Sequence, residues 1–378
     1  MVHLMTPLDR LEWGVGGSGL SFRSRVVVRK TSKRHRGVAA IYAAAAASTG
    51  SSTPPPPPTP IQKPTTSSFN LACPICQTSR FEVIKRYGKV DIGNTKLRCP
   101  RCQRQFLLRK GLGPSSATTT ETRDGYLDLT LTSGVTPRAY QQRSWTGTEL
   151  FRNPVVSLAY ERGWRQSFAW AGFPGVDEES QLAIDFLRPA HGEVIVDMSC
   201  GSGLFSRRFL SSGKFAGVIA ADYSESMLEE TYRNFTAQKM DLDQNRFLLV
   251  RADVARLPFT TGSVAGIHAG AALHCWPNPQ AAVAEISRVL KPGGVFVAST
   301  FLTGTAALGQ LLGNDDLVRP LRGLESVVGS SNAYRWWEED EIRDLCDTAG
   351  LQSFMRERKN RFIMFCVSKP LFSSGDEE

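Results

Sequence analysis

The sequence lacks an apolar stretch long enough to cross a membrane. Its 378 residues are 41% hydrophobic, which is ordinary for a globular protein. No uninterrupted apolar run reaches the ~18 residues that a spanning helix needs. The run Ala43–Ala47 is too short and its side chains are too small to serve as an anchor. We therefore expect no transmembrane segment, and the length allows two domains with a sizeable core.

Acidic residues are scarce at the start of the chain, and the apolar core of a secretory signal is absent there. Basic residues cluster from Arg23 to Arg36 among Ser, Thr and Ala, and the runs Ala43–Ala47 and Pro54–Pro58 follow. This composition is typical of an organelle transit peptide with a proline-rich linker. We expect residues 1–70 to direct the protein to the chloroplast, either to the stroma or, by peripheral association, to plastoglobule lipid bodies. A mitochondrial address is less favoured because an Arg-rich amphipathic helix is missing; an untargeted basic tail is the alternative.

The cysteines are not distributed like a disulfide framework. Four of the eight form two Cys-x-x-Cys pairs separated by 22 residues, and the other four are scattered, which suits a reducing compartment. Two such pairs can supply the four thiolates of a tetrahedral zinc ribbon. We expect a structural Zn²⁺ in a module spanning residues 71–110, with the ligands Cys73, Cys76, Cys99 and Cys102.

The net charge of +9 is concentrated in the first part of the chain. Residues 1–64 carry +7 and residues 73–110 carry +8, so the remaining residues together carry −6. The cysteine module also contains Phe81, Tyr87 and Phe106. A basic ribbon with interspersed aromatic residues can hold RNA, whereas many small zinc modules only brace a neighbouring domain. Both interpretations stay open at this point.

Strand and helix patterns alternate from residue 176 to residue 370. This alternation predicts an α/β domain with a Rossmann-like, mostly parallel, seven-stranded sheet that ends in an antiparallel hairpin. We expect residues 111–175 to form a connecting and cap region and residues 371–378 a polar tail. The expected strands are Glu193–Asp197, Ala216–Ala221, Arg246–Arg251, Val264–Ala269, Val295–Thr300, Leu351–Arg356 and Arg361–Val367. The expected helices are Val176–Leu187, Leu204–Ser211, Ser224–Gln238, Pro279–Leu290 and Glu338–Ala349.

Three acidic residues end three successive predicted strands. Asp197 precedes the turn Cys200-Gly-Ser-Gly203, whose small residues allow a ligand close to the backbone, and Asp222 and Asp253 end the next two strands. A dinucleotide would place its pyrophosphate at this turn, and Asp197 would repel it by roughly 1 to 4 kcal/mol depending on burial. The same carboxylate attracts a cationic ligand. The pattern therefore favours a cation over a dinucleotide, with Asp222 suited to ribose hydroxyls and Asp253 to an adenine amine.

These stretches resemble the class I S-adenosylmethionine-dependent methyltransferases. The resemblance covers about 176–370 and rests on VDMSCGSG from Val196, ADYSESM from Ala221, ADVARLPF from Ala252 and EISRVLKPGGVF from Glu285. The last is typical of the quinone and sterol methylases. One departure is Ser199, where the family usually has glycine; serine is tolerated there if its φ is negative. The residues that the resemblance assigns to S-adenosylmethionine are Asp197, Ser199, Cys200, Gly201, Gly203, Asp222, Tyr223, Met227, Asp253, Val254, Gly270 and Ala271.

The segment after the fourth predicted strand lines the methyl-donor pocket across that family. Here it contains Gly270, Ala271, His274 and Trp276. His274 is the candidate general base, with an expected near-neutral pKa, although local packing alone would also explain it. We expect Trp276 to pack in the core and not to stack on a substrate. Methyl transfer to an activated nucleophile often needs only proximity and alignment.

The cysteine module and the strand that follows it are also similar to the start of bacterial ribosomal RNA guanine-N1 methyltransferases. The match runs from Cys73 to Leu129, but Cys102 stands where those enzymes commonly have histidine. The whole arrangement resembles plant plastid methyltransferases of unassigned substrate. Three hypotheses follow: transfer to a small apolar metabolite such as a prenyl quinone, transfer to a ribosomal RNA base, or a non-enzymatic RNA-binding scaffold. Aromatic residues in 139–175 and 302–337 are expected to govern the choice of acceptor.

Overall fold

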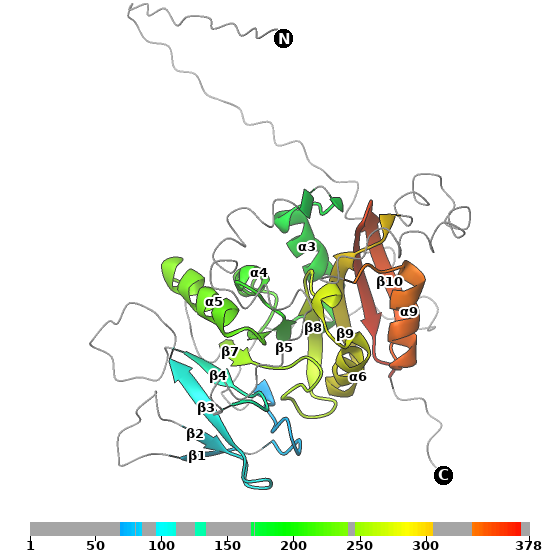
Figure 1. Ribbon diagram of the computed structural model, residues 1–378. Coiled ribbons are helices and arrows are strands. Elements are labelled where there is room, and N and C mark those ends of the chain that lie inside the picture. The colour runs from blue at the N-terminus through cyan, green and yellow to red at the C-terminus, as the bar shows by residue number, and fades with distance from the viewer. Residues whose placement is uncertain are drawn as a thin grey trace, which may run out of the picture. The chain divides into compact units, whose positions relative to one another are not determined.

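The computed structural model describes the residues that follow the leader and linker, with several gaps (Figure 1). The described ranges are 69–79, 81–84, 96–110, 125–133, 168–169, 171–240, 246–304 and 335–371. The expected transit peptide, most of the aromatic cap region 139–175 and most of the insertion 302–337 lie outside them. Among the described residues, none of the helices is both long and apolar enough for a membrane span.

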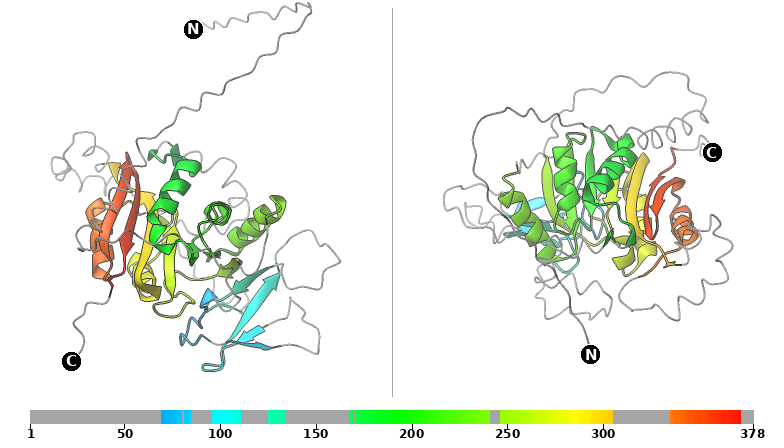
Figure 2. Two further views of the ribbon diagram at one scale, coloured as in Figure 1. Left: turned by 180° about the vertical axis from the view of Figure 1, so that it is seen from behind. Right: turned by 90° about the horizontal axis from the view of Figure 1, so that it is seen from above.

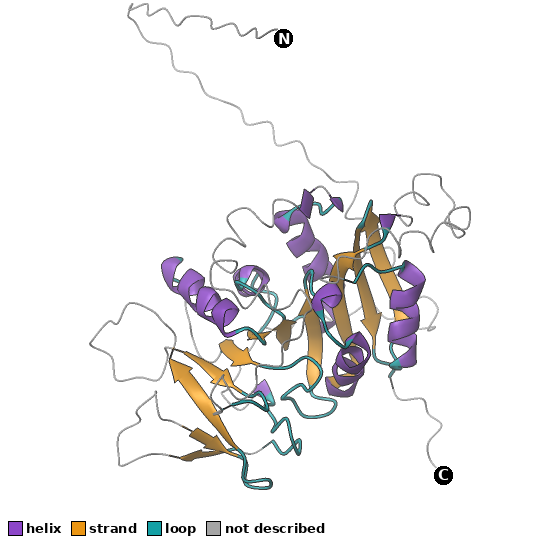
Figure 3. Ribbon diagram, in the orientation of Figure 1, coloured by secondary structure: helices purple, strands orange, loops and turns teal. Residues whose placement is uncertain are grey.

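A single mixed sheet forms the centre of the described chain (Figures 1 and 3). The predicted seven-stranded, Rossmann-like sheet is confirmed, with its strands in the order β7-β6-β5-β8-β9-β11-β10. The last two pairings along it, β9 with β11 and β11 with β10, are antiparallel, and the second is the expected hairpin. These strands are β5 (Val194–Met198), β6 (Gly217–Asp222), β7 (Phe247–Arg251), β8 (Val264–Ala269), β9 (Leu290–Phe301), β10 (Gln352–Lys359) and β11 (Phe362–Ser368).

Helices cover both faces of this sheet, as parallel crossover connections require (Figure 2). The helices α3, α4 and α5 lie on one face, and α6 and α9 lie on the other. All five were predicted within one or two residues, and Ser224 caps α5 as expected by accepting a hydrogen bond from the Met227 N–H. Their bounds are α3 (Val176–Phe186), α4 (Leu204–Ser211), α5 (Glu225–Ala237), α6 (Pro279–Val289) and α9 (Glu339–Thr348), with short 3₁₀ turns η7 (Arg188–Ala190) and η8 (Leu273–Cys275).

One strand begins earlier than the sequence predicts. Lys291-Pro-Gly-Gly294 ends α6 as expected, but β9 already starts at Leu290 and pairs there with Val264. The register then shifts between Val264 and Gly266, which accommodates Pro292 and the glycines in an irregular first part of the strand. The prediction that the strand starts at Val295 is therefore wrong by five residues.

The cysteine module extends the same sheet. Strands β1 (Glu82–Ile84), β2 (Lys96–Arg98) and β3 (Gln105–Lys110) are antiparallel neighbours, and β3 pairs with β4 (Gly125–Asp128). Strand β4 then pairs in parallel with β7, so that the sheet has 11 strands. The division of the chain at residue 110 stays a prediction, although strands on either side of it are hydrogen-bonded to each other.

The hydrophobic core is continuous between the module and the α/β domain. The buried side chains of Cys99 and Phe106 belong to the same cluster as Val250, Leu257 and Phe259. Burial of this kind stabilises by about 25 cal/mol per Å² of apolar surface, and it is shared by both parts of the chain. The module is therefore packed as part of the domain that carries the three strand-end aspartates.

Candidate functional site

The turn after β5 has the backbone conformation that its glycines predict. Gly201 and Gly203 have φ angles of 57° and 76°, in the left-handed region. A Cβ on Gly203 would lie 2.6 Å from Cγ2 of Thr231, so the helix α5 also requires glycine there. Thr231 donates to the Gly201 carbonyl at 2.7 Å, and Asn234 donates to the Ser202 carbonyl at 3.2 Å. Side chains of α5 thus fix the shape of the turn.

Ser199 does not have the negative φ that we expected. Its φ is 58°, which costs a non-glycine residue roughly 1 kcal/mol or more. The Trp276 indole N–H donates to the Ser199 hydroxyl at 3.1 Å, which offsets part of this cost. Trp276 is 7% exposed, so the prediction that it packs in the core is confirmed. A side chain from the segment after β8 thus holds the serine that stands where the family usually has glycine.

Replacing Ser199 with valine should destabilise the fold by about 1–3 kcal/mol, because a β-branched residue strongly disfavours positive φ. Ser199→Gly should change stability by less than about 1 kcal/mol, since strain relief and the lost hydrogen bond oppose each other. The free energy of unfolding in urea measures both. Ser211→Val, at an exposed helical position, is the matched control. An equal loss of unfolding free energy in Ser199→Val and Ser211→Val would contradict the claim that the backbone at Ser199 is strained.

Asp197, near the end of β5, is buried. It is 1% exposed, its Oδ1 accepts from His268 Nδ1 at 2.8 Å, and its Oδ2 accepts from the Ser206 hydroxyl. His268 sits opposite it on β8 and is fully buried. Both carboxylate oxygens are therefore used within the protein. The predicted contact between Asp197 and a cationic ligand stays a prediction, which the near-complete burial of this carboxylate disfavours.

Asp222 joins the turn to the end of β6. Its Oδ2 accepts from the Gly201 N–H at 3.0 Å and its Oδ1 accepts from the Ser224 N–H at 2.8 Å. Desolvation raises the pKa of this carboxyl to about 6, although the two backbone donors act in the opposite direction. Tyr223 follows it, with the Arg251 guanidinium 5.2 Å from its ring centre, and Met227 is buried in the first turn of α5.

Asp253 and Val254 begin a tight loop after β7. The Ala252 N–H donates to the Asp222 carbonyl at 3.0 Å, which brings the ends of β6 and β7 together. Asp253 Oδ1 accepts from the Ala255 N–H at 2.9 Å, and Val254 is 8% exposed. The structure thus places Asp222 and Asp253 at adjacent strand ends, as the sequence predicts for neighbouring parallel strands.

The segment after β8 is closely packed. A Cβ on Gly270 would lie 2.9 Å from Cε1 of His268, so only glycine fits without movement. Ala271 has a φ of 50°, and its N–H donates to the Ser299 hydroxyl at 2.9 Å. Residues held in such sparsely populated conformations often belong to functional sites. The side chain of Cys200, in the turn after β5, is buried, with its Sγ 3.9 Å from the Thr231 hydroxyl.

The near-neutral pKa expected for His274 is wrong. The ring is 7% exposed, and burial lowers its pKa to about 3. Its Nδ1 shares a hydrogen bond with the Thr300 hydroxyl at 3.2 Å. A neutral imidazole with so low a pKa is a poor proton acceptor at pH 7. Its assignment as general base stays a prediction that this burial disfavours.

Aromatic side chains gather where β8 and β9 end. The ring of Phe301, the last residue of β9, lies 4.8 Å from His274, 4.6 Å from Phe173, 5.1 Å from Phe168 and 5.7 Å from Trp336. We call these five residues the aromatic cluster. Ligands of open parallel sheets bind at the carboxyl ends of the strands, so this cluster borders the expected ligand site on the β9 side.

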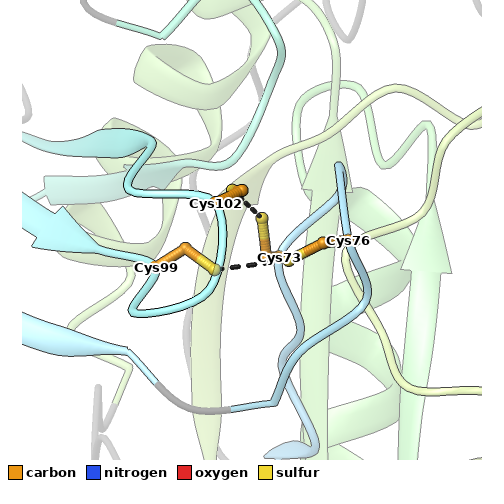
Figure 4. A group of neighbouring side chains, drawn as sticks. All are labelled: Cys73, Cys76, Cys99 and Cys102. Carbon is orange, nitrogen blue, oxygen red and sulfur yellow. Dashed lines mark hydrogen bonds between the residues drawn. The ribbon is translucent and has the colours of Figure 1, made fainter.

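The four predicted metal ligands converge from two loops (Figure 4). Their Sγ atoms all lie within 4.8 Å of one another, with Cys73 and Cys102 at 3.6 Å and Cys76 and Cys99 at 3.4 Å. Zn–S bonds of 2.3 Å in a tetrahedron place sulfurs ~3.8 Å apart. Thiol pairs this close, with no disulfide among them, fit a Zn²⁺ ion.

Both cysteine loops have the same backbone geometry. The Gln77 N–H donates to the Cys73 carbonyl at 2.8 Å, and the Gln103 N–H donates to the Cys99 carbonyl at 2.9 Å. Gln77 and Gln103 have φ angles of 59° and 61°. A repeated turn of this kind points the two cysteines of each pair to one centre, which supports metal binding by both pairs.

Several residues around the site were missed by sequence analysis. They share the property that they hold the turn, the aspartates or the neighbouring loops, some from the next helix and others from elements distant in sequence. The spacing of Thr231 and Asn234 on one face of α5 was the only available signal, and it is common on helices. The missed residues are Ser206, Arg207, Thr231, Asn234, Arg251 and Arg256.

Comparison with known proteins gives one consistent result. Residues 196–298 match a family described as a methyltransferase domain. Two uncharacterized chloroplastic methyltransferases of Arabidopsis thaliana are 42% identical over 303 residues and 41% identical over 305 residues. These alignments cover 79% of this chain and 79% and 78% of the relatives. A demethylmenaquinone methyltransferase of Beutenbergia cavernae is 29% identical over 206 residues, which cover 54% of this chain and 75% of that protein.

Proposed function

Since this chain belongs to the S-adenosylmethionine-dependent methyltransferases, we propose that it methylates a small apolar acceptor such as a prenyl quinone. The observation that carries this proposal is the aromatic cluster at the ends of β8 and β9. Aromatic side chains suit a flat, apolar molecule and offer little to a charged polymer. Its similarity to a demethylmenaquinone methyltransferase is consistent with the same acceptor class.

The donor site in this proposal is built on the three strand ends. Asp222 accepts hydrogen bonds from the ribose hydroxyls, Tyr223 and Met227 flank the nucleoside, and Asp253 and Val254 contact the adenine. The turn from Ser199 to Gly203, Gly270 and Ala271 approach the methionine part. Asp197 takes part from below the turn, where it accepts from His268 and Ser206.

Proximity and alignment supply most of the catalysis in this proposal. When bound, S-adenosylmethionine would supply an electrophilic methyl group: the acceptor would provide the electron pair of the new bond, the pair of the old C–S bond would stay on sulfur, and the acceptor would lose one proton to solvent. The chain holds donor and acceptor in line, and the buried segment from Ala271 to His274 excludes water. His274 orients Thr300 and packs on Phe301 in this scheme, because its low pKa makes proton abstraction inefficient.

RNA remains the alternative acceptor, and two observations weigh against it. The strands of the cysteine module pair with β4, whereas the aromatic cluster lies at the ends of β8 and β9, with β7, β6 and β5 between β4 and β8. Arginines of the module are also used internally: Arg98 pairs with Glu82, and Arg104 donates to the Leu131 carbonyl at 2.6 Å. A metabolite acceptor needs neither the module's charge nor its position.

A plastid address and a structural Zn²⁺ complete the proposal. Both Arabidopsis relatives are named chloroplastic, which supports a location in the plastid. The composition of the leader agrees with this location. Fractionation of plastids into stroma and plastoglobules tests where in the plastid the protein works. The four thiols of the module supply the zinc ligands.

Acceptor labelling tests the proposed function. Purified full-length protein is incubated with methyl-labelled S-adenosylmethionine and either plastid lipid extract or plastid ribosomal RNA. We expect label in a lipid product and none in RNA. The matched control is Asp222→Ala, which should label neither. Label confined to RNA, with a binding constant that weakens steeply with salt, would replace the metabolite with the nucleic acid as acceptor.

A further inference from the structure

The loop that carries Asp253 is attached directly to the first cysteine loop. Residues 70–72 run antiparallel to 258–260, with the Ala72 N–H donating to the Pro258 carbonyl at 2.8 Å and the Thr260 N–H donating to the Asn70 carbonyl at 3.2 Å. Leu71 and Phe259 form the bridge between them. The chain therefore passes from this contact into Cys73 without a flexible spacer.

Arg256 makes the closest side-chain link between the two loops. Its Nε donates to the Pro74 carbonyl at 2.6 Å, and Pro74 lies between the ligands Cys73 and Cys76. Its backbone N–H donates to the Asp253 carbonyl at 2.9 Å, which closes the tight turn around Asp253. Arg256 thus contacts the loop of Asp253, which the proposal assigns to adenine, with its main chain. Its side chain contacts the loop between Cys73 and Cys76.

A second link joins β4, the strand that follows the module, to the ribose side. Asp128 on β4 is fully buried, and its carboxylate lies 3.3 Å from Arg251 Nη1. Arg251 Nε donates to the Tyr223 carbonyl at 3.0 Å, and its Nη1 lies 2.7 Å from Glu225. Both segments assigned to the nucleoside are therefore fixed by residues that also contact the module or the strand that follows it.

We propose that the metal-filled cysteine centre braces the adenosine end of the cofactor site, and that Arg256 is the positioning residue that transmits this support to Asp253. This rests on the donor site given above. Zinc that holds Cys73 and Cys76 fixes the Pro74 carbonyl, which fixes Arg256 and hence the turn at Asp253. Preorganisation of that turn lowers the ordering cost of cofactor binding. The brace acts on affinity for the cofactor and leaves methyl transfer at saturating cofactor unchanged.

Titration of S-adenosylhomocysteine into zinc-loaded, full-length protein tests this role. We expect Arg256→Ala to weaken binding by about tenfold, the effect of one lost hydrogen bond from a charged group, with one zinc per chain retained. The KM for S-adenosylmethionine should rise by a similar factor at unchanged kcat, and Arg256→Lys should restore part of the affinity. Amide hydrogen exchange in 252–260 should become faster.

The matched control is Arg101→Ala. Arg101 donates to the Cys76 carbonyl on the same cysteine loop at 3.5 Å, and no hydrogen bond from it to 253–260 is found among the described residues. We expect affinity within twofold of the original. The proposed brace would be overturned if Arg256→Ala bound S-adenosylhomocysteine with the original affinity. It would also be overturned if Arg101→Ala lost as much affinity as Arg256→Ala. Failure of the unaltered protein to bind S-adenosylhomocysteine would instead refute the donor site, and label in RNA would refute only the proposed acceptor.

Discussion

Replacing Asp222 with alanine is expected to weaken S-adenosylhomocysteine binding by about two orders of magnitude or more. The carboxylate lies at the end of β6 and accepts from the Gly201 and Ser224 N–H groups, so it also holds the turn to the strand end. Each charge-assisted hydrogen bond to a ribose hydroxyl contributes roughly 1.5–3 kcal/mol, and alanine removes both. Isothermal titration calorimetry measures the change.

The control for this variant is Asp344→Ala. Asp344 is an exposed carboxylate on α9 and should leave the affinity unchanged. The free energy of unfolding of both variants should be recorded, so that a fold defect is separated from a binding defect. Unchanged affinity in a folded Asp222→Ala protein would show that the cofactor lies elsewhere.

The affinity should also depend on pH through Asp222. Its pKa in the folded chain is about 6, above the ordinary 3.8, because the carboxyl is desolvated. We expect a constant dissociation constant above pH 7 and a rise of at most about tenfold per pH unit below 6, as the acceptor is protonated. A raised carboxyl pKa means that this group stabilises the folded chain as the pH falls from 6 towards 4. The predicted loss of affinity therefore cannot be explained by unfolding caused by this residue.

Removing Cys99 is expected to have the largest effect on stability. The side chain is fully buried and belongs to the core cluster that includes Val250 and Phe259. Structural zinc contributes about 10–16 kcal/mol of apparent binding free energy in small zinc domains, and part of it is folding free energy. Cys99→Ala should lose the bound zinc, and its melting temperature should fall by about 10 °C or more. Metal content and thermal unfolding are the two measurements.

Cys346→Ala is the matched control because Cys346 is also fully buried in that core but lies on α9. It should keep its zinc and lose only about 1–2 kcal/mol, the cost of a small cavity. Equal melting temperatures for the two alanine variants, or a full zinc content in Cys99→Ala, would mean that the four thiols do not form a stabilising metal centre.

Much of the fold follows from local sequence patterns. All seven strands and five helices of the α/β domain were predicted, because apolar periodicity and helix caps act within a few residues. The irregular start of β9 was missed, because proline and two glycines suggest a turn and only pairing with β8 makes them part of a strand. The addition of β4 to β7 was also not predicted, since short strands far apart in sequence give no signal of their partners.

The sequence by itself determined the chemical groups at the site: two cysteine pairs, a glycine turn, and three aspartates at the ends of successive strands. The tertiary structure decided what each of them contacts. Asp197 bonds to His268 across 71 residues, Trp276 holds Ser199 across 77, and Arg256 reaches Pro74 across 182. Periodicity and spacing report only on neighbours along the chain, whereas burial, pKa and hydrogen-bond partners depend on which distant strands lie side by side. That is why Asp197, the aspartate closest to the turn, accepts from His268 and Ser206, and why the first cysteine loop contacts the loop of Asp253.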